Sequence, residues 1–461
     1  MTDFDCIVFG GGTGNTVASA AAAEGLETAL IEKGPLGGLC LNRGCNPSKM
    51  LIEHARRLEQ VRNADRFGID ASIEDVRFGA LVREVNDELA EVAEEKRETK
   101  LAEENLTLFQ EEARFVDDHT IELADSGETH SGERIVLAAG STPVAPGAID
   151  GLEDTDYLTS ADALGLEALP ERLVVLGGGY IAAELGYYFD AFGTDVALIE
   201  AEESLVPRED DDVARELTDV AGERHDVYTG YRASAVAESE GEITVTAESE
   251  GGEEITVAGE ELLVALGRQP NTEGIDLDAT SVETNDAGFV ETDAQLRTNV
   301  ENVWAMGDIA ENGMFKHSGD YEGEIAIDNV ARGESREADF AALPHAIFTE
   351  PQIGAVGKTE AELDDEGIDY AVGRAEIADT AMARALKLDR GFAKVLADPD
   401  SREILGCHIV GHEASMLIHE AAPAMRYGGT IDDLANTLIH AHPALNKVLM
   451  KACKNVPDDA E

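Results

Sequence analysis

Residues 4–33, FDCIVFGGGTGNTVASAAAAEGLETALIEK, decide the fold of this chain. The segment Cys6–Phe9 is a short apolar run, which predicts a buried β-strand. An alanine-rich helix is predicted from about Thr16, and a second apolar run at Thr28–Ile31 predicts the next strand. This order of strand, glycine-rich turn, helix and strand predicts an α/β fold with a parallel sheet.

The turn between the first strand and the helix carries the glycines of a dinucleotide-binding site, Gly10, Gly12 and Gly14. Glycines there allow a tight turn and let the backbone approach a pyrophosphate, which faces the helix N-terminus. Glu32 ends the second strand, about 20 residues on, where an acid binds ribose hydroxyls. Asn15 stands where a third glycine is usual, so the packing of helix on strand is left open. The segment is predicted to be a Rossmann unit.

A second unit of the same design lies at residues 173–200, LVVLGGGYIAAELGYYFDAFGTDVALIE. Gly177, Gly179 and Ala182 occupy the turn positions, and Glu200 ends the following strand. One such glycine motif is weak evidence, but two in the same strand–turn–helix–strand context are much stronger. We therefore expect two dinucleotides, one bound and one exchanging, in an electron relay.

The composition restricts the partners of the protein. The chain has 461 residues, too many for one ordinary core, so two or three domains are expected. Its 35 Lys and Arg residues against 95 Asp and Glu residues give a net charge of −60, which repels nucleic acid and anionic membranes. No apolar run reaches the about 18 residues of a membrane span. Five cysteines without a secretion signal indicate a reducing cytoplasm.

The scattered acidic residues predict a protein adapted to molar salt, where the screening length shrinks to about 3 Å and self-repulsion largely disappears. The alternative is a merely acidic protein of ordinary salt tolerance. We expect dialysis into dilute buffer to unfold the protein, followed as loss of far-UV circular dichroism. A spectrum unchanged by dialysis would support the alternative.

The stretch GGLCLNRGCNPSKML, residues 37–51, places Cys40 and Cys45 five residues apart. The pair is open to three interpretations: a structural disulfide, half of a metal site, or a redox pair that opens and closes in turnover. No second Cys or His pair has ligand spacing, so no metal is expected. Cys45 opens a predicted helix with proline in its first turn, and free N–H groups there favour a thiolate.

Several further motifs share their order with a known family. They are IVLAAGSTP (135–143), LLVALGRQPNT (262–272), VWAMGDI (303–309), FTEPQIGAVG (348–357) and IHAHPALNK (439–447). The two glycine-rich turns are called the first cradle (residues 10–14) and the second cradle (residues 177–182). With these cradles and the cysteine pair, the chain resembles the pyridine nucleotide–disulfide oxidoreductases from end to end. The resemblance implies an FAD-binding domain at residues 1–145 and 272–340, an NAD(P)-binding domain at 146–271, and an α+β dimerisation domain at 341–461.

The resemblance also assigns the cofactors. It implies NADPH as donor, with NADH as the alternative because Glu200 suits a ribose 2′-hydroxyl. It implies that FAD is bound by Gly10, Gly12, Gly14, Glu32, Lys49, Gly140, Asp308 and His317, and the nicotinamide cofactor by Gly177, Gly179, Ala182, Glu200 and Gly267.

The resemblance further implies the catalytic roles. Cys45 lies on the flavin side as the charge-transfer thiol, and Cys40 attacks the substrate disulfide. Lys49 pairs with Glu184 near the flavin. His442 is the general acid/base and reaches the active site of the partner subunit in a homodimer. His440 is expected to be structural.

Two cations depart from the family pattern beside the reactive thiols. Arg43 stands where a small apolar residue is usual, and Lys447 where a glutamate normally orients the histidine. Arg43 is either a salt-bridge partner for the acidic surface or, with Lys447, a binder of substrate carboxylates. The second interpretation predicts a small acidic disulfide as substrate, most specifically bis-γ-glutamylcystine, the disulfide of the thiol that halophilic archaea use instead of glutathione.

Two related activities are the alternatives. Dihydrolipoamide dehydrogenase normally keeps the HPTLSE-type ending that is lost here. Mercuric reductase uses a second pair of adjacent cysteines at the C-terminus, whereas Cys453 stands alone in LMKACKNVPDDAE.

Overall fold

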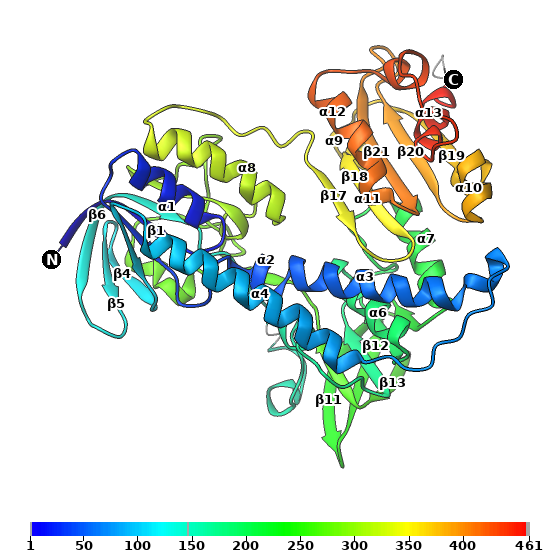
Figure 1. The fold of residues 1–461 in the computed structure, drawn as a ribbon, viewed down its shortest axis with the longest axis horizontal. Helices are drawn as coiled ribbons and strands as arrows, with labels where there is room; N and C mark the ends of the chain where they lie inside the picture. The colour runs from blue at the N-terminus through cyan, green and yellow to red at the C-terminus, as the bar shows by residue number, and fades with distance from the viewer. Residues whose placement is uncertain (1, 145–146, 458–461) are drawn as a thin grey trace.

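The computed structural model describes residues 2–144 and 147–457 (Figure 1). The first sheet has the order β3-β2-β1-β6-β5-β4, and a strand from much later in the chain, β16, pairs with β6. β1, β2, β3, β6 and β16 are parallel, and β4 and β5 form an antiparallel extension. The bounds are β1 Thr2–Phe9, β2 Thr28–Ile31, β3 Leu106–Phe109, β4 Ala113–Asp117, β5 Thr120–Leu123, β6 Thr129–Leu137 and β16 Val303–Ala305.

Helices α1 (Gly14–Ala23) and α8 (Lys316–Ala326) pack together on this sheet. Val17 and Ala21 of α1 share a buried cluster with Ile325 of α8 and with the strand residue Val8. The predicted strand and helix are both present, although β1 begins four residues before Cys6 and α1 two residues before Thr16.

Three helices follow the first unit: α2 (Gly38–Arg43), α3 (Cys45–Arg62) and α4 (Phe78–Leu101). α3 packs against α6 (Tyr180–Phe192) of the second unit, and the two helices share a buried cluster with α4. This packing matters for the site because it brings the start of α3 against the buried face of α6 (Figure 1).

The second unit has a parallel sheet of order β10-β9-β8-β14, with an antiparallel sheet β11-β12-β13 beside it. Two short strands, β7 and β15, pair with each other where the chain passes between the units. The bounds are β7 Ser141–Pro143, α5 Ser160–Ala163, β8 Arg172–Leu176, β9 Asp195–Glu200, α7 Asp211–Gly222, β10 Asp226–Thr229, β11 Tyr231–Ser239, β12 Glu242–Ser249, β13 Glu254–Gly259, β14 Glu261–Val264 and β15 Arg268–Pro270.

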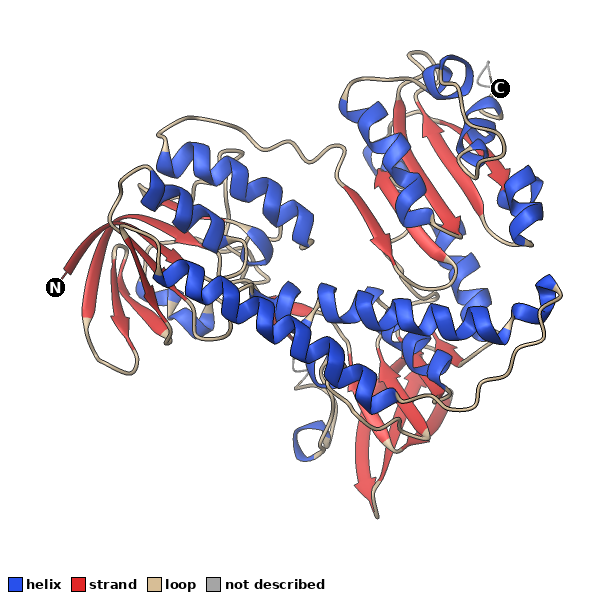
Figure 2. Cartoon of the chain, in the orientation of Figure 1, coloured by secondary structure: helices blue, strands red, loops and turns tan. Residues whose placement is uncertain are grey.

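The C-terminal part is an antiparallel sheet of order β17-β18-β21-β20-β19 with helices on it (Figure 2). A buried cluster joins it to the second unit, since Val213 and Leu217 of α7 pack with Ile353 and Val410 of this sheet. The bounds are β17 Pro344–Ile347, β18 Gln352–Gly357, α9 Glu360–Glu366, β19 Ala371–Glu376, α10 Ala381–Leu386, β20 Phe392–Ala397, β21 Ile404–Gly411, α11 Ala414–Leu417, α12 Ala421–Arg426 and α13 Lys447–Lys454.

The predicted fold class, two dinucleotide-binding α/β units with a C-terminal α+β domain, is confirmed. The predicted domain boundary between residues 145 and 146 lies outside the described residues. Single helical turns complete the fold: Ala64–Phe67, Leu152–Asp154, Glu273–Ile275, Leu277–Ala279, Gly307–Ile309, Ile327–Ala331, Ile377–Asp379, Ile418–Glu420 and Asp433–Thr437.

Candidate active site

The first cradle has the close backbone approaches that a dinucleotide-binding turn needs. Gly10 has φ of +101°, and a Cβ there would lie 2.1 Å from the Ala138 carbonyl oxygen. A Cβ on Gly38 would lie 2.7 Å from the Cα of Gly12, so the start of α2 contacts the turn directly. Glu32 accepts hydrogen bonds from the backbone N–H groups of Gly11 and Gly34, both at 2.7 Å. These residues fit the pyrophosphate and ribose of FAD.

Asn15 resolves the question that its place in the motif left open. Its side-chain amide donates to the carbonyl oxygens of Gly11 and Gly12, and the residue is buried. Gly14 instead provides the close packing of helix on strand expected of the third glycine, because a Cβ there would lie 3.0 Å from the side chains of both Ala138 and Val8. Sequence reasoning missed this exchange of roles between neighbouring residues.

The second cradle repeats the geometry of the first. Gly177 has φ of +105°, and a Cβ there would lie 2.5 Å from the Ala265 carbonyl oxygen. Glu200 accepts from the backbone N–H groups of Gly178 and Glu202. Ala182 is fully buried where α6 packs on its sheet, whereas a Cβ on Gly179 would meet nothing within 4 Å. The turn is therefore open at the position where a pyrophosphate would approach.

Three motifs far apart in the chain meet through hydrogen bonds. The Ser141 hydroxyl donates to an Asp308 carboxylate oxygen at 2.6 Å and accepts from the Arg268 guanidinium at 2.8 Å. Burial lowers the pKa of Arg268, although the Asp308 carboxylate and the Cys45 sulfur act to raise it. Asp308, predicted to bind FAD, thus lies in a network beside the redox pair. Gly140 and Gly267 flank the same β7–β15 pair.

A buried carboxylate that sequence reasoning missed supports this network. Glu322 of α8 accepts a hydrogen bond from the Gly307 N–H at 2.6 Å. Burial raises the pKa of Glu322 to about 7. An acid in the helix that follows the AMGDI motif was the only sequence signal for it.

The redox pair lies across the junction of two helices. Cys40 is in α2, Cys45 is the first residue of α3, and Gly44 between them has neither helical φ nor helical ψ. All five cysteines of the chain are free thiols, and Cys6, Cys407 and Cys453 are buried. Cys40 is partly exposed and Cys45 is exposed, so these two cysteines are the accessible ones.

The two thiols differ in acidity. The Cys40 thiol lies between two acceptors, the Asn46 side-chain oxygen, with Sγ and Oδ1 3.6 Å apart, and the Cys45 sulfur. Its hydrogen bonding to the Cys45 sulfur, with the Lys49 ammonium, lowers the pKa of Cys45 from 9.0 to about 7 against the effect of burial. The same hydrogen bond, with burial, raises the pKa of Cys40. Near neutral pH the pair therefore holds a thiolate at Cys45 and a thiol at Cys40.

Lys49 and Glu184 form the predicted pair, with Nζ and Oε2 2.5 Å apart. The other oxygen of Glu184 accepts from the Phe348 N–H at 3.0 Å, and the Lys49 ammonium lies 5.1 Å from the centre of the Phe348 ring. Glu184 is buried and Lys49 is partly exposed. Lys49 lies one turn from Cys45 on α3, and the packing of α3 on α6 holds its ammonium against Glu184.

Aromatic rings form a parallel group beside the second cradle. Phe315 stacks on His345, His317 and Tyr180, with ring centroids 5.3–6.2 Å apart and interplanar angles of 12° or less. Tyr180 donates to Glu209 at 2.6 Å, and His345 bonds to the same carboxylate oxygen. His317, predicted to contact FAD, also bonds through Nε2 to the Pro344 carbonyl oxygen.

Two cations lie on the Cys40 side of the pair. Arg43 is exposed at the end of α2, and it forms no ion pair within the part of the chain that the structure describes. The Lys316 ammonium at the start of α8 lies close enough to Cys40 to act on its pKa. It lowers this pKa, but the effects that raise it are larger. Sequence reasoning did not single out Lys316.

His442 lies in the loop before α13, in the C-terminal domain, and is exposed. Lys447, the first residue of α13, approaches it with Nζ 3.2 Å from Nδ1. His440 bonds instead to Glu420, with Nε2 and Oε1 2.6 Å apart. No contact joins His442 to the cysteine pair of the same chain among the described residues, so its predicted catalytic role requires the partner subunit.

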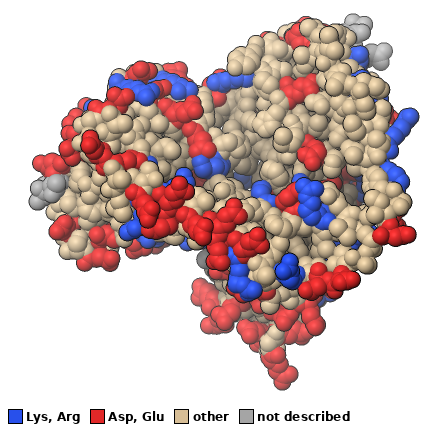
Figure 3. All heavy atoms as spheres, in the orientation of Figure 1, with Lys and Arg blue, Asp and Glu red and all other residues tan. Residues whose placement is uncertain are grey.

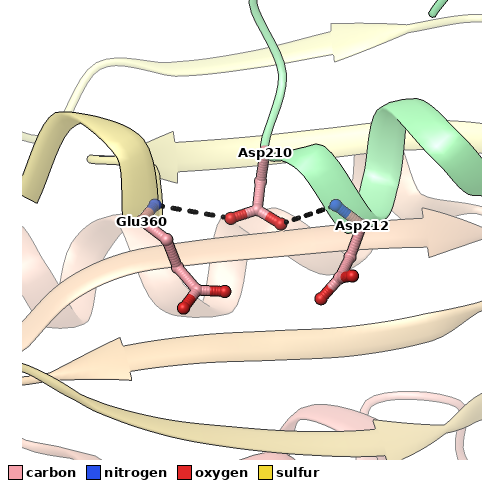
Figure 4. A group of neighbouring side chains, drawn as sticks. All are labelled: Asp210, Asp212 and Glu360. Atoms are coloured by element: carbon pink, nitrogen blue, oxygen red, sulfur yellow. Dashed lines mark hydrogen bonds between the residues drawn. The ribbon is translucent and has the colours of Figure 1, made fainter. Parts of the chain in front are cut away.

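An acidic group away from the cradles brings together Asp210, Asp212 and Glu360 (Figure 4). The Lys394 ammonium lies among them, 2.7 Å from Asp210 and 2.9 Å from Asp212, and it also contacts Glu360. Asp210 further accepts from the backbone N–H groups of Asp212 and Glu360. The cluster is thus an ion-pair group around the buried Lys394 and Asp210, with Asp212 and Glu360 partly exposed, where α7, α9 and β20 meet.

The C-terminal domain presents apolar side chains to solvent. Ile439 is 99% exposed, Tyr427 87% and Met416 67%. On the visible face this domain carries few charges, whereas acidic residues gather along α4 (Figure 3).

The comparisons with known proteins agree with this geometry. The model of the pyridine nucleotide-disulphide oxidoreductases matches residues 4–328, and the model of their dimerisation domain matches residues 343–453. The chain is a member of this family. It therefore uses FAD and NAD(P)H, and its C-terminal domain is a dimerisation domain that supports a homodimer. When bound, FAD would supply electron transfer between the nicotinamide and the cysteine pair.

The relatives carry two kinds of name. A dihydrolipoyl dehydrogenase of Haloferax volcanii is 38% identical and covers 98% of this chain and 96% of its own length. Dihydrolipoyl dehydrogenase 3 of Haloarcula marismortui is 35% identical and covers 100% and 98%. The solved structure of RclA, a HOCl-induced flavoprotein disulfide reductase from Escherichia coli, has a TM-score of 0.86 at 26% identity, covering 98% and 100%.

None of the helices in residues 2–144 and 147–457 is both long and apolar enough to cross a membrane.

Proposed function

We propose that this oxidoreductase reduces a small acidic disulfide, most specifically bis-γ-glutamylcystine, in the cytoplasm. The observation that carries the proposal is Arg43, an exposed guanidinium without an ion-pair partner in the described residues, three positions from the attacking Cys40. A guanidinium binds carboxylates in bidentate fashion, and on a chain of charge −60 a free one beside the reactive thiol favours an anionic substrate. The unpaired state of Arg43 weakens the surface salt-bridge alternative.

The cysteine pair supplies two electrons and one proton to the reaction. Cys40 passes its proton to Cys45 along their hydrogen bond and attacks one sulfur of the substrate, which releases the first thiolate. Cys45 then attacks Cys40 in the mixed disulfide, the Cys40–Cys45 bond forms, and the second thiolate leaves with the proton that began on Cys40. One further proton is needed for the first thiolate.

The donor in the proposal is NAD(P)H. The resemblance suggests NADPH, whereas Glu200 favours NADH because its carboxylate lies at the end of β9, where it would bind a ribose 2′-hydroxyl and repel a 2′-phosphate. Kinetics with both nicotinamides separate these two expectations.

The proposal is tested with steady-state kinetics in molar KCl on bis-γ-glutamylcystine, glutathione disulfide, lipoamide and mercuric ion. We expect the highest kcat/KM for bis-γ-glutamylcystine. Arg43→Ala should raise KM for the acidic disulfides about tenfold, because about one charged hydrogen bond is lost. The KM for lipoamide should not change. Arg57→Ala is the matched control, since Arg57 is exposed and paired with Glu53 on α3. Equal effects on both substrate classes would refute the charge argument.

The second candidate is dihydrolipoamide dehydrogenase, which the names of the halophilic relatives support. A preference for lipoamide in the wild-type enzyme would establish it. Mercuric reduction is disfavoured, because Cys453 is buried in α13 and the chain has no neighbouring cysteine there to carry a metal ion.

A further inference from the structure

The contact between Lys447 and His442 determines which nitrogen of the imidazole carries its proton. Lys447 Nζ lies 3.2 Å from His442 Nδ1. An ammonium has only N–H donors, so Nδ1 must accept this hydrogen bond with its lone pair. The neutral ring then carries its proton on Nε2, the nitrogen that points away from Lys447. A carboxylate in place of Lys447 would select the opposite tautomer.

The Glu420 carboxylate, which bonds to two residues of this loop, has both oxygens occupied by partners other than His442. One oxygen of Glu420 bonds to His440 at 2.6 Å and the other accepts from the Asn446 amide at 2.7 Å. Within the described residues no carboxylate contacts His442. A cation alone therefore holds the ring of the predicted acid/base.

The contact occupies the lone pair of Nδ1, so that nitrogen has no site for a further proton while Lys447 keeps its own. Protonation of Nδ1 would break the hydrogen bond to Lys447 and place two positive charges side by side. The Lys447 ammonium already carries a proton, and the imidazole ring connects Lys447 to Nε2. The pair is built to move a proton from Lys447 to Nε2 without charging the imidazole.

We propose that Lys447 is the proton donor for the leaving thiolate and that His442 relays its proton. The Nε2–H bond breaks as the S–H bond of the released thiol forms, and a Lys447 N–H bond breaks as Nδ1–H forms. The ammonium and the thiolate become a neutral amine and a neutral thiol, so protons and charge balance. A proton from solvent at Nε2 and return of the Nδ1 proton to the amine restore the pair.

This inference rests on the proposed disulfide reduction but not on the identity of the disulfide. The relay serves any leaving thiolate, whereas a carboxylate-binding role of Lys447 would serve acidic substrates alone. Lipoamide as a neutral probe therefore tests the relay, and the wild-type preference among disulfides tests the proposed function separately.

The experiment reoxidises the reduced holoenzyme with lipoamide or bis-γ-glutamylcystine in a single turnover. Lys447→Met should slow reoxidation about 100-fold with both disulfides, the usual contribution of a positioned acid. Lys447→Glu removes the ammonium but gives Nδ1–H a carboxylate acceptor, so His442 itself can hold and donate the proton, and the rate should fall less than in Lys447→Met. Lys451→Met, one turn further along α13, is the matched control and should react like the wild type.

Two readouts separate a relay from a structural role. In mixtures of H₂O and D₂O the wild-type rate should depend on the deuterium fraction along a curve, since two protons move, and the Lys447→Glu rate along a straight line. Nitrogen-15 spectra of labelled histidine should show Nδ1 of His442 unprotonated in the wild type and protonated in Lys447→Glu. The proposal is overturned by wild-type reoxidation rates in Lys447→Met, by loss confined to the acidic disulfide, or by a protonated Nδ1 in the wild type.

Discussion

Replacement of Cys40 by serine should abolish disulfide reduction, by about 10⁴-fold or more, while the Cys45 thiolate persists. The attacking atom is lost, because a serine hydroxyl is a weak nucleophile without a general base. The hydroxyl can still donate to the Cys45 sulfur as the Cys40 thiol does, and Lys49 is unchanged, so the pKa of Cys45 stays near its wild-type value of about 7. The measurement is turnover together with the pH dependence of the long-wavelength absorption of a thiolate beside the flavin.

Cys40→Ala is the matched variant for this prediction. It removes the hydrogen bond that contributes most to the lowered pKa of Cys45, so the thiolate signal should titrate at higher pH, between about 7 and the ordinary 9.0. In either variant the signal is present above the pKa and lost as pH falls through it. Equal titration of the Ser and Ala variants would show that the hydrogen bond does not control the acidity of Cys45.

The parts of the site predicted from sequence are those that local pattern determines. The glycine turns, Glu32 and Glu200 follow directly from the order of strand, turn, helix and strand, because the turn length and the strand end fix their positions. Cys45 at a helix start is likewise a local property, and α3 begins at that residue. These features need no knowledge of which segments meet in space.

Sequence reasoning missed the features that depend on contacts between distant segments of the chain or on the direction in which a side chain points. Ser141, Arg268 and Asp308 meet only because β7 pairs with β15 and β16 returns to the first sheet. Lys447 was predicted to attract substrate, and its contact with His442 depends on the direction in which α13 starts. The charge of Lys447 was evident from sequence, but its direction was not.

Replacement of Lys394 by methionine should lower the free energy of unfolding by about 3–5 kcal/mol, the usual effect of removing one partner from a buried ion pair. Lys394 is 1% exposed and the nearby Asp210 is also 1% exposed. Burial, which lowers the pKa of Lys394, is outweighed by hydrogen bonds to Asp210, Glu360 and Asp212, so its pKa is raised. Methionine keeps the volume but leaves the carboxylates unpaired. Denaturant unfolding in molar KCl measures the loss.

The control is Arg390→Met. Arg390 forms an ion pair with Glu223 of the second unit, as Lys394 does with Asp210, but both side chains of that pair are largely exposed. Such a surface pair contributes at most about 1 kcal/mol, and molar salt screens it further. A loss in Lys394→Met no larger than that in Arg390→Met would show that the buried cluster adds no stability.

The pH dependence gives this prediction a sign. Despite burial, which raises it, the pKa of Asp212 is lowered by its hydrogen bond to Lys394, so the stability that Asp212 contributes is present above its unfolded pKa and lost as pH falls below it. In Lys394→Met the unpaired carboxylates repel one another, so their protonation at lower pH reduces the loss of stability in the variant. The difference between wild type and variant should therefore be largest near neutral pH and shrink toward about pH 4. Because the cluster joins α7 to β20 and α9, this difference measures how far one buried ammonium holds the nucleotide-binding unit against the dimerisation domain.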